Sequence, residues 1–268
     1  WICLWGESLS HLEIGEKNAQ FLVSGQLYSA DLLVVAEGIE GGLCQQLGIA
    51  YTEHAYHEVA LYANVVCAKP KRFTAFERFL QSEVLALLPM TENRYSLIWT
   101  FPDAYLSEVE AYDSDTLKRQ LLSRFGFRMG DWLSIGQRQF FPLVKLVAAE
   151  QVRHRVVILG NAAHTIHPVA AQGLNLTVRD IKELVRYCVT SFDNTPESTG
   201  FGSFVGLWAY EQQRQSDQTR VIHSTGFIRG LFQADSLLLS LARSKGLWLL
   251  ESLPAVKQKF TSIAMRGT

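Results

Sequence analysis

The stretch VVILGNAAHTIHPVAAQGLNLTVRD, residues 156–180, decides the fold around it. It opens with four apolar residues, Val156 to Leu159, which predict an inner strand of a sheet covered on both faces. A turn at Gly160-Asn161 and a loop ending at Pro168 come next. A helix is predicted to begin at Gln172-Gly173. The loop therefore brings the N-terminus of a helix to the end of a strand.

The predicted helix is amphipathic. Its apolar positions recur at helical spacing: Leu174, Val178, Ile181, Val185 and Cys188. Charged residues take the other side: Arg179, Asp180, Lys182, Glu183 and Arg186. The start of a helix has unpaired N–H groups and about half a positive charge, so it suits an anion or a ring that becomes anionic. Gly173 allows a flat ligand to approach the main chain, although such junctions are also common without a cofactor.

The letters of this stretch resemble the second flavin-binding motif of the FAD-dependent aromatic hydroxylases, G-D-A-A-H-x3-P-x2-G-Q-G-x-N. The resemblance is closest to the ubiquinone-biosynthesis branch, and within it to the 2-polyprenyl-6-methoxyphenol hydroxylases. The matching positions are Gly160, Ala162, Ala163, His164, Pro168, Gln172, Gly173, Asn175 and Asp180. Asn161 and Ala171 depart from the motif, which has Asp and Gly there.

This resemblance implies a set of FAD-binding residues. In the family, the residue at position 161 accepts a hydrogen bond from a flavin ribitol hydroxyl, and the amide oxygen of Asn161 can still accept it. The methyl group of Ala171 lies where the loop approaches the ring. The expected cofactor-binding residues are Gly160, Asn161, Pro168, Gln172, Gly173, Leu174 and Asn175, together with Glu37 and Gly38.

Glu37 and Gly38 follow a second short apolar strand, Leu32 to Ala36. The family has Asp-Gly here, then Ser and Arg, near the cofactor pyrophosphate. This chain has Glu37 for the Asp, Gly41 at the Ser and Gln45 at the Arg. Taken alone, the Glu-Gly pair also fits a plain turn that ends a strand.

The remaining pattern predicts an α/β (α+β) fold, with part of a Rossmann-type FAD domain, an antiparallel-sheet substrate domain and C-terminal helices. Four strand-like runs lie between Glu58 and Phe101. We predict a partial FAD-binding domain over 1–55, the substrate domain over 56–145, the FAD-binding domain continued over 146–200, and a helical region over 201–268. The sheet aromatics either contact the substrate or pack in the core: Phe73, Phe76, Phe79, Tyr95 and Trp99.

The C-terminal region carries two further patterns. Tyr210, Arg214 and Asp217 share one helix face, which allows an internal ion pair. In the tail, the apolar positions are Val256, Phe260 and Ile263, and the basic ones are Lys257, Lys259 and Arg266. A basic amphipathic helix of this kind either lies on an anionic membrane or packs on the protein's own core or on a partner.

Composition excludes several classes of function. A net charge of −1 gives no basic face for nucleic acid. The four cysteines are widely spaced, which favours reduced thiols in the cytoplasm. No apolar run approaches the ~20 residues of a membrane span. His164 and His167 lack a third ligand nearby, so no metal site is expected. No G-x-S-x-G motif supports a hydrolase.

An N-terminal G-x-G-x-x-G is missing from residues 1–25. Because the chain starts at Trp1, we expect a truncated hydroxylase that purifies colourless, is inactive and self-associates through an uncovered sheet edge or apolar face. The alternative is a natural protein that does not bind flavin in the family manner.

The resemblance implies an FAD-dependent monooxygenase that hydroxylates a polyprenylated phenol in ubiquinone biosynthesis. NAD(P)H reduces the flavin, molecular oxygen supplies the inserted atom, and no side chain is expected to be catalytic. Partners include other subunits of the biosynthetic complex, and the location is cytoplasmic with peripheral contact with the inner membrane. Two rivals stay open: a flavin hydroxylase for another ring position or aromatic substrate, and a non-catalytic assembly subunit.

Overall fold

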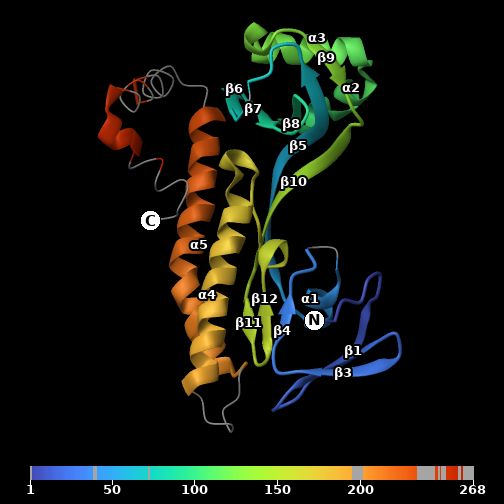
Figure 1. Cartoon of the computed structure of the whole chain (residues 1–268), viewed down its shortest axis with the longest axis vertical. Helices are drawn as coiled ribbons and strands as arrows, with labels where there is room; N and C mark the ends of the chain where they lie inside the picture. Colours follow the sequence, from blue (N-terminus) through green and yellow to red (C-terminus); the bar gives the residue numbers. More distant parts are fainter. Residues whose placement is uncertain are drawn as a thin grey trace. The chain divides into compact units, whose positions relative to one another are not determined.

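The computed structural model of the chain describes residues 2–38, 41–71, 73–194, 202–233, 245–246, 248, 252–258 and 261. Contacts divide the chain into two compact units, each made of two segments. The first unit comprises Trp1–Glu53 and Lys145–Ser224, and the second comprises His54–Val144 and Thr225–Thr268. Each unit contains both strands and helices (Figure 1). The chain therefore leaves each unit once and returns to it.

The first unit holds the strand that the central motif predicts. β12 (Val156–Ile158) pairs in parallel with β4 (Leu33–Val35) and antiparallel with β11 (Val152–Arg153). All three residues of β12 are buried, as expected for an inner strand covered on both faces. The predictions of a strand at 156–159 and of an earlier one at 32–36 are confirmed.

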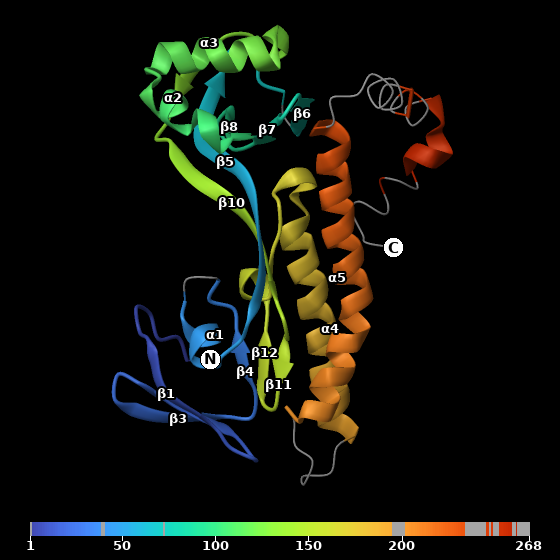
Figure 2. The ribbon, with the colours of Figure 1, turned by 180° about the vertical axis from the view of Figure 1, so that it is seen from behind.

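Other elements of the first unit surround this small sheet. An antiparallel sheet consists of β1 (Leu9–Ile14), β2 (Ala19–Val23) and β3 (Gln26–Ala30). The short helix α1 (Leu43–Gln46) follows β4. Between β12 and the long helices lie η3 (Gly160–Ala162), β13 (His164–Thr165) and η4 (Val169–Ala171). Then α4 (Gln172–Asn194) and α5 (Phe204–Gln233) run side by side (Figures 1 and 2). The residues of α5 after Ser224 belong to the second unit.

α4 buries a different face from the one that its aliphatic spacing predicts. Its buried positions are Leu176, Asp180 and Leu184, and Leu184 packs in a cluster with residues of β12 and α5. Four of the predicted apolar positions are instead 43% to 74% exposed: Leu174, Val178, Ile181 and Val185. The helical spacing gave the wrong face because it placed the charged Asp180 outside, whereas Arg214 neutralises this residue in the interior and His164 hydrogen-bonds to it.

The second unit contains the predicted antiparallel strands. They are confirmed as β5 (Tyr51–Cys67), β6 (Phe76–Leu80), β7 (Glu83–Pro89) and β8 (Arg94–Pro102), in the order β5-β8-β7-β6. β9 (Trp132–Ile135) pairs with β5, and β10 (Gln139–Ala148) belongs to the same sheet. Both β5 and β10 begin in one unit and end in the other.

One face of this sheet forms the core of the second unit. Trp99 and Tyr95 of β8 are buried together with Leu117 and Leu121 of α3 (Ser114–Phe125). η1 (Asp103–Tyr105), α2 (Leu106–Ala111) and η2 (Phe127–Met129) complete this side. Of the aromatics considered for substrate contact, Tyr95 and Trp99 therefore pack in the core. Phe73 is 97% exposed.

The tail is described in part. Val256 is 45% exposed. The other tail residues named above, except Lys257, lie outside the described residues: Phe260, Ile263, Lys259 and Arg266. Within the described ranges, no helix has both the length and the apolar character needed to span a bilayer.

Candidate functional site

The loop between β12 and α4 is tied to the rest of the first unit at several points. The Ala163 carbonyl accepts a hydrogen bond from the Ala148 N–H at 2.9 Å, and β13 pairs with the end of β10 through Val147 and His164. The Tyr51 hydroxyl donates to the Ala162 carbonyl at 2.7 Å. These bonds fix the backbone around the small residues Ala162 and Ala163 without using any exposed side chain. The loop is therefore a rigid platform.

His164, at the centre of this loop, is anchored to α4 and α5 by a buried carboxylate. Its Nε2 lies 2.7 Å from Oδ2 of Asp180, and Nε of Arg214 donates to Oδ1 of Asp180 at 2.6 Å. The His164 and Asp180 side chains are 0% and 1% exposed. Burial by itself would raise the pKa of Asp180, but the hydrogen bonds from His164 and Arg214 outweigh it and lower this pKa.

The network continues beyond Arg214. Its Nη2 donates to Oδ2 of Asp217 at 2.6 Å, and Nε of Arg179 forms an ion pair with the same oxygen at 3.0 Å. The predicted internal ion pair between Arg214 and Asp217 is confirmed. Burial tends to lower the pKa of Arg214, but its bonds to Asp180 and Asp217 raise it. Two carboxylates thus share two guanidinium groups inside the unit.

His167, the second histidine of the loop, is also committed to structure. It is 1% exposed, and its Nδ1 accepts a hydrogen bond from the Val169 N–H at 3.1 Å. His164 is held by Asp180 instead, so the two rings have different hydrogen-bond partners. Across the described part of the chain, no group of three His, Cys, Asp or Glu side chains could hold a metal ion.

The start of α4 is open in the way that a ligand would require. Its first turn contains no acidic side chain that would neutralise the helix dipole. Leu174 is 74% exposed, and Asn175 is exposed beside it. A Cβ added at Gly173 would meet only Cγ1 of Ile166, at 3.8 Å, so internal packing does not demand glycine there. The glycine therefore leaves room on the outer side of the helix start.

Ala171, one of the two departures from the motif, has a backbone φ of 47°. This left-handed conformation is easy for glycine and costs other residues on the order of 1 kcal/mol. Glycine suits this position of the motif because the backbone is left-handed there. Ala171 adopts the same conformation under strain. Gly160, at the other end of the loop, has φ 65° and retains the glycine.

Glu37 and Gly41, two departures in the earlier motif, are explained by each other. Oε1 of Glu37 accepts a hydrogen bond from the Leu43 N–H at 2.5 Å, which caps α1. A Cβ added at Gly41 would lie 2.1 Å from the Glu37 carboxyl carbon. The longer acid therefore fills the space that the family's serine side chain would use. Gly38 has φ 80° and nothing within 4 Å of an added Cβ, so its surroundings are open.

The fold brings the two motifs to one edge of the parallel sheet. Val35 pairs with Ile158, and the Leu159 N–H donates to the Val35 carbonyl at 2.8 Å. Glu37 and Gly160 each lie two residues beyond these partners, at the carboxyl ends of neighbouring parallel strands. Ligands of open α/β sheets bind outside such ends. The residues predicted from sequence at positions 37–38 and 160–161 are therefore neighbours in space.

Sequence reasoning missed two residues that hold this site. Tyr51 fixes the loop through Ala162, and no local motif marks it because its partner is far away in sequence. Burial raises the pKa of Tyr51, so its hydroxyl stays protonated and can donate. Arg214 was assigned only to an internal ion pair with Asp217 on its own helix, whereas it also bonds to Asp180 on α4.

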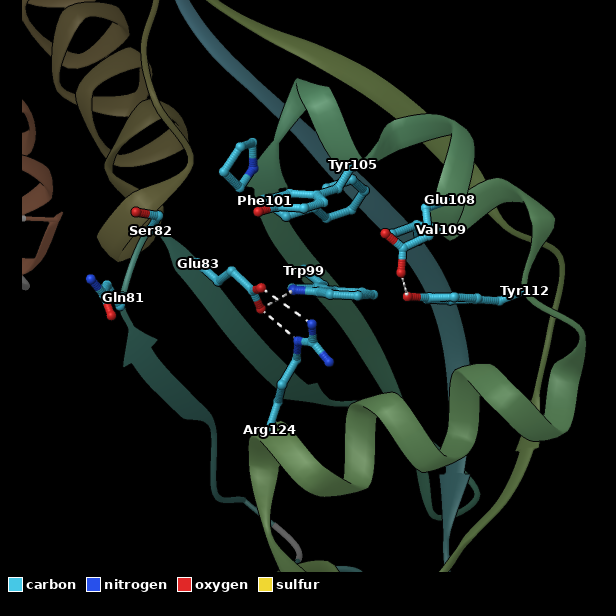
Figure 3. Close-up of a pocket in the computed structure, with 11 residues that line it drawn as sticks. Gln81, Ser82, Glu83, Trp99, Phe101, Tyr105, Glu108, Val109, Tyr112 and Arg124 are labelled. Carbon is cyan, nitrogen blue, oxygen red and sulfur yellow. Dashed lines mark hydrogen bonds and ion pairs between the residues drawn. The ribbon is translucent and has the colours of Figure 1, made fainter.

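A separate cavity of about 460 Å³ lies in the second unit (Figure 3). Glu83 of β7 accepts hydrogen bonds there from Nε of Arg124 at 2.7 Å and from Nε1 of Trp99 at 3.0 Å. Arg124 also donates to Gln120 and lies 4.8 Å from the Trp99 ring centroid. The Arg124 guanidinium is therefore occupied by hydrogen bonds within the protein. Together with Glu83 and Trp99 it joins α3 to the sheet.

Comparison with known proteins identifies the class of this chain. A family model described as FAD binding domain matches residues 18–216, which is more than half of the chain. The chain belongs to this FAD-binding-domain family. The match includes both strand ends described above and the whole of α4.

The curated relatives agree with the resemblance to ubiquinone-biosynthesis hydroxylases, since their names are those of such enzymes. Ubiquinone hydroxylase UbiL of Rhodospirillum rubrum is 31% identical over 91% of this chain and 56% of its own length. Ubiquinone biosynthesis monooxygenase COQ6, mitochondrial, of Rattus norvegicus is 27% identical over 91% of this chain and 58% of its own. The chain spans a little over half the length of these relatives.

Solved structures confirm the mixed α/β fold. HpxO of Klebsiella pneumoniae, complexed with FAD and uric acid, superposes with a TM-score of 0.67 and 18% identity, covering 90% of this chain and 62% of the other. Because the identity is low, this superposition supports the fold and nothing further.

Proposed function

We propose that the protein is an FAD-dependent monooxygenase that hydroxylates a polyprenylated phenol in ubiquinone biosynthesis. The two relatives are named as a ubiquinone hydroxylase and a ubiquinone biosynthesis monooxygenase, and these names support both hydroxylation and the ubiquinone pathway. NAD(P)H is the proposed reductant. When bound, FAD supplies the oxygen-activating chemistry that protein side chains lack.

The observation that carries this proposal is the meeting of the two motifs at one sheet edge, next to the open start of α4. In the proposal, Glu37 and Gly38 contact the cofactor from one strand end, and Gly160 and Asn161 from the other. The remaining contacts come from Pro168, Gln172, Gly173, Leu174 and Asn175. These residues bind and orient the cofactor, and the dipole of α4 favours negative charge at the start of the helix.

A wall for the substrate is available in the second unit, on the sheet face opposite its core. Tyr62 of β5 pairs with Ile98 of β8, and Ile98 pairs with Ala86 of β7, so the three side chains form a half-buried row. Burial raises the pKa of Tyr62 and keeps it neutral. Its ring meets Phe141 edge-on at 5.5 Å. We propose that this largely apolar row contacts the phenol ring.

The test uses the native gene product, purified from its own host. The expected result is bound FAD in about one-to-one ratio and NAD(P)H oxidation that depends on a prenylated phenol, with a hydroxylated product identified by mass spectrometry. An Ile98→Asp variant should retain FAD but lose turnover, because it places a charge in the apolar row.

Two other outcomes would redirect the assignment. A product hydroxylated only from an unprenylated aromatic, or at another ring position, would indicate a different flavin hydroxylase. Absence of FAD and of turnover would favour a non-catalytic assembly subunit, a reading that the departures at Asn161 and Ala171 motivate. The proposed location is cytoplasmic, with contact with the inner membrane and with other subunits of the biosynthetic complex.

A further inference from the structure

Two segments of the second unit adjoin to form one surface, here named the aromatic tip: residues 68–71 with 73–76, and residues 125–131. The Ala68 N–H donates to the Asp131 carbonyl at 2.9 Å, and the Lys69 N–H donates to the Met129 carbonyl at 2.8 Å. The rings of Phe76 and Phe125 meet edge-on with centroids 5.7 Å apart. Backbone bonds and ring packing therefore hold both segments in place against each other.

Each segment of the aromatic tip exposes a phenylalanine. Phe73 is 97% exposed, the highest value among the exposed large hydrophobic residues of the described chain, and Phe127 is 75% exposed. The segment of Phe73 is anchored by Tyr95, whose hydroxyl donates to the Lys71 carbonyl at 2.7 Å and accepts from the Lys71 N–H at 2.8 Å. Largely exposed aromatic rings on anchored segments mark an interaction surface.

Positive charge lies on the same two segments as these rings. Lys69, Lys71 and Arg128 are exposed on the same two segments, and Asp131 is the one acidic residue there. The Arg128 guanidinium lies 6.0 Å from the Phe76 ring centroid, which keeps this cation at the aromatic tip. Exposed Phe residues among Lys and Arg are the composition that enters the headgroup region of anionic membranes.

We propose that the aromatic tip binds the surface of an anionic lipid bilayer, with Phe73 and Phe127 inserted among the headgroups and the three cations on lipid phosphates. The inference deepens the proposed function, because a polyprenylated substrate resides in a bilayer, but it assigns the contact to this surface rather than to the C-terminal tail.

Flotation of the native gene product with phosphatidylcholine vesicles, with and without phosphatidylglycerol, tests the proposal. We expect binding that requires phosphatidylglycerol and weakens with salt. Replacing both rings, Phe73→Ser with Phe127→Ser, should lower the partition coefficient at least about tenfold. Replacing two charges, Lys69→Gln with Lys71→Gln, should lower it roughly thirtyfold.

Matched substitutions elsewhere serve as controls. Phe227→Ser removes a ring that is 70% exposed in α5, and Lys182→Gln removes an exposed charge of α4, so both should bind vesicles like the native protein. Equal flotation of native protein and tip variants would overturn the proposal. So would a loss seen only with Lys257→Gln, which would place the contact in the tail.

Turnover of a short-chain, water-soluble phenol, measured on the same preparations, separates this inference from the proposed enzyme activity. Tip variants that lose flotation but keep this turnover support the aromatic tip as a membrane contact. If the native protein floats but does not hydroxylate any phenol, the activity proposal fails while the membrane contact stands.

Discussion

The imidazole Nε2 of His164 lies 2.7 Å from Oδ2 of Asp180, in a place where neither side chain is exposed beyond 1%. His164 belongs to the loop at the sheet edge, and Asp180 belongs to the third turn of α4. This bond therefore joins the loop to the helix whose start it precedes. Arg214 holds the other carboxylate oxygen, so the position of the loop depends on α5 as well.

Replacing Asp180 with Asn should destabilise the fold by about 1 to 3 kcal/mol, because the buried Arg214 would lose one of its two carboxylate partners. Urea unfolding followed by circular dichroism measures this change. Asp115→Asn is the matched control, since Asp115 forms an exposed pair with Lys118 and should change the free energy of unfolding by no more than about 0.5 kcal/mol. Equal effects of the two substitutions would contradict the structural role of Asp180.

The stability that Asp180 contributes should depend on pH. Its pKa is lower in the folded state than the ordinary value of about 3.9 in the unfolded chain, so the unfolded state binds the proton more readily in acid. The contribution is therefore complete above about pH 5 and is lost as the pH falls below about 4 towards the folded pKa. Unfolding free energies of native protein and Asp180→Asn should differ by a constant amount from pH 7 to 5 and converge below that window. If the difference in unfolding free energy grew in acid instead, the folded-state pKa of Asp180 would be raised and not lowered.

Ala171→Gly should stabilise the protein by about 0.5 to 1 kcal/mol and should not weaken FAD binding, because glycine adopts the φ of 47° without strain. The same substitution at Ala111, in the last turn of α2, should destabilise by a similar amount because glycine is a poor helix former. Thermal unfolding of the two variants checks the opposite signs. Loss of stability in Ala171→Gly would refute the strain argument.

Gly41→Ser introduces the family residue and should cost about 0.5 to 2 kcal/mol, because its Cβ would displace the exposed Glu37 carboxylate from the Leu43 N–H that it caps. Glu37→Asp shortens the acid and should make the serine tolerable. A double-mutant cycle on unfolding free energy should give a coupling larger than about 1 kcal/mol. Additive effects would mean that the two departures arose independently.

Gly173→Val should lower FAD affinity by blocking close approach to the start of α4, while the fold persists because an added Cβ has only an ordinary contact with Ile166. The proposed dipole effect on the reduced ring is worth roughly 0.3 to 1 kcal/mol, and up to about 2 when partly buried. FAD titration and the flavin reduction potential measure both effects in the native gene product. Gly226→Val, at an α5 glycine with open space around it, is the control. Unchanged affinity and potential in Gly173→Val would remove this glycine from the site.

The sequence by itself determined the class of protein and most of the elements. Four apolar residues before Gly160 sufficed to predict the inner strand, because local burial follows directly from composition. The letters from Gly160 to Asp180 sufficed for the family because they resemble a known flavin-binding motif at nine positions. The alternating runs of the second unit likewise predicted its antiparallel strands.

Only the tertiary structure decided which face of α4 is buried and what the departures from the motifs mean. Asp180 looked like a surface residue because its partners, His164 and Arg214, are distant in sequence, and charge pairs override aliphatic spacing in the interior. Glu37 and Gly41 occur together because a side chain at position 41 would overlap the Glu37 carboxyl group, and this overlap is visible only in the folded structure. Long-range contacts of this kind arise only when separate segments fold together, so they cannot be read from any one of them.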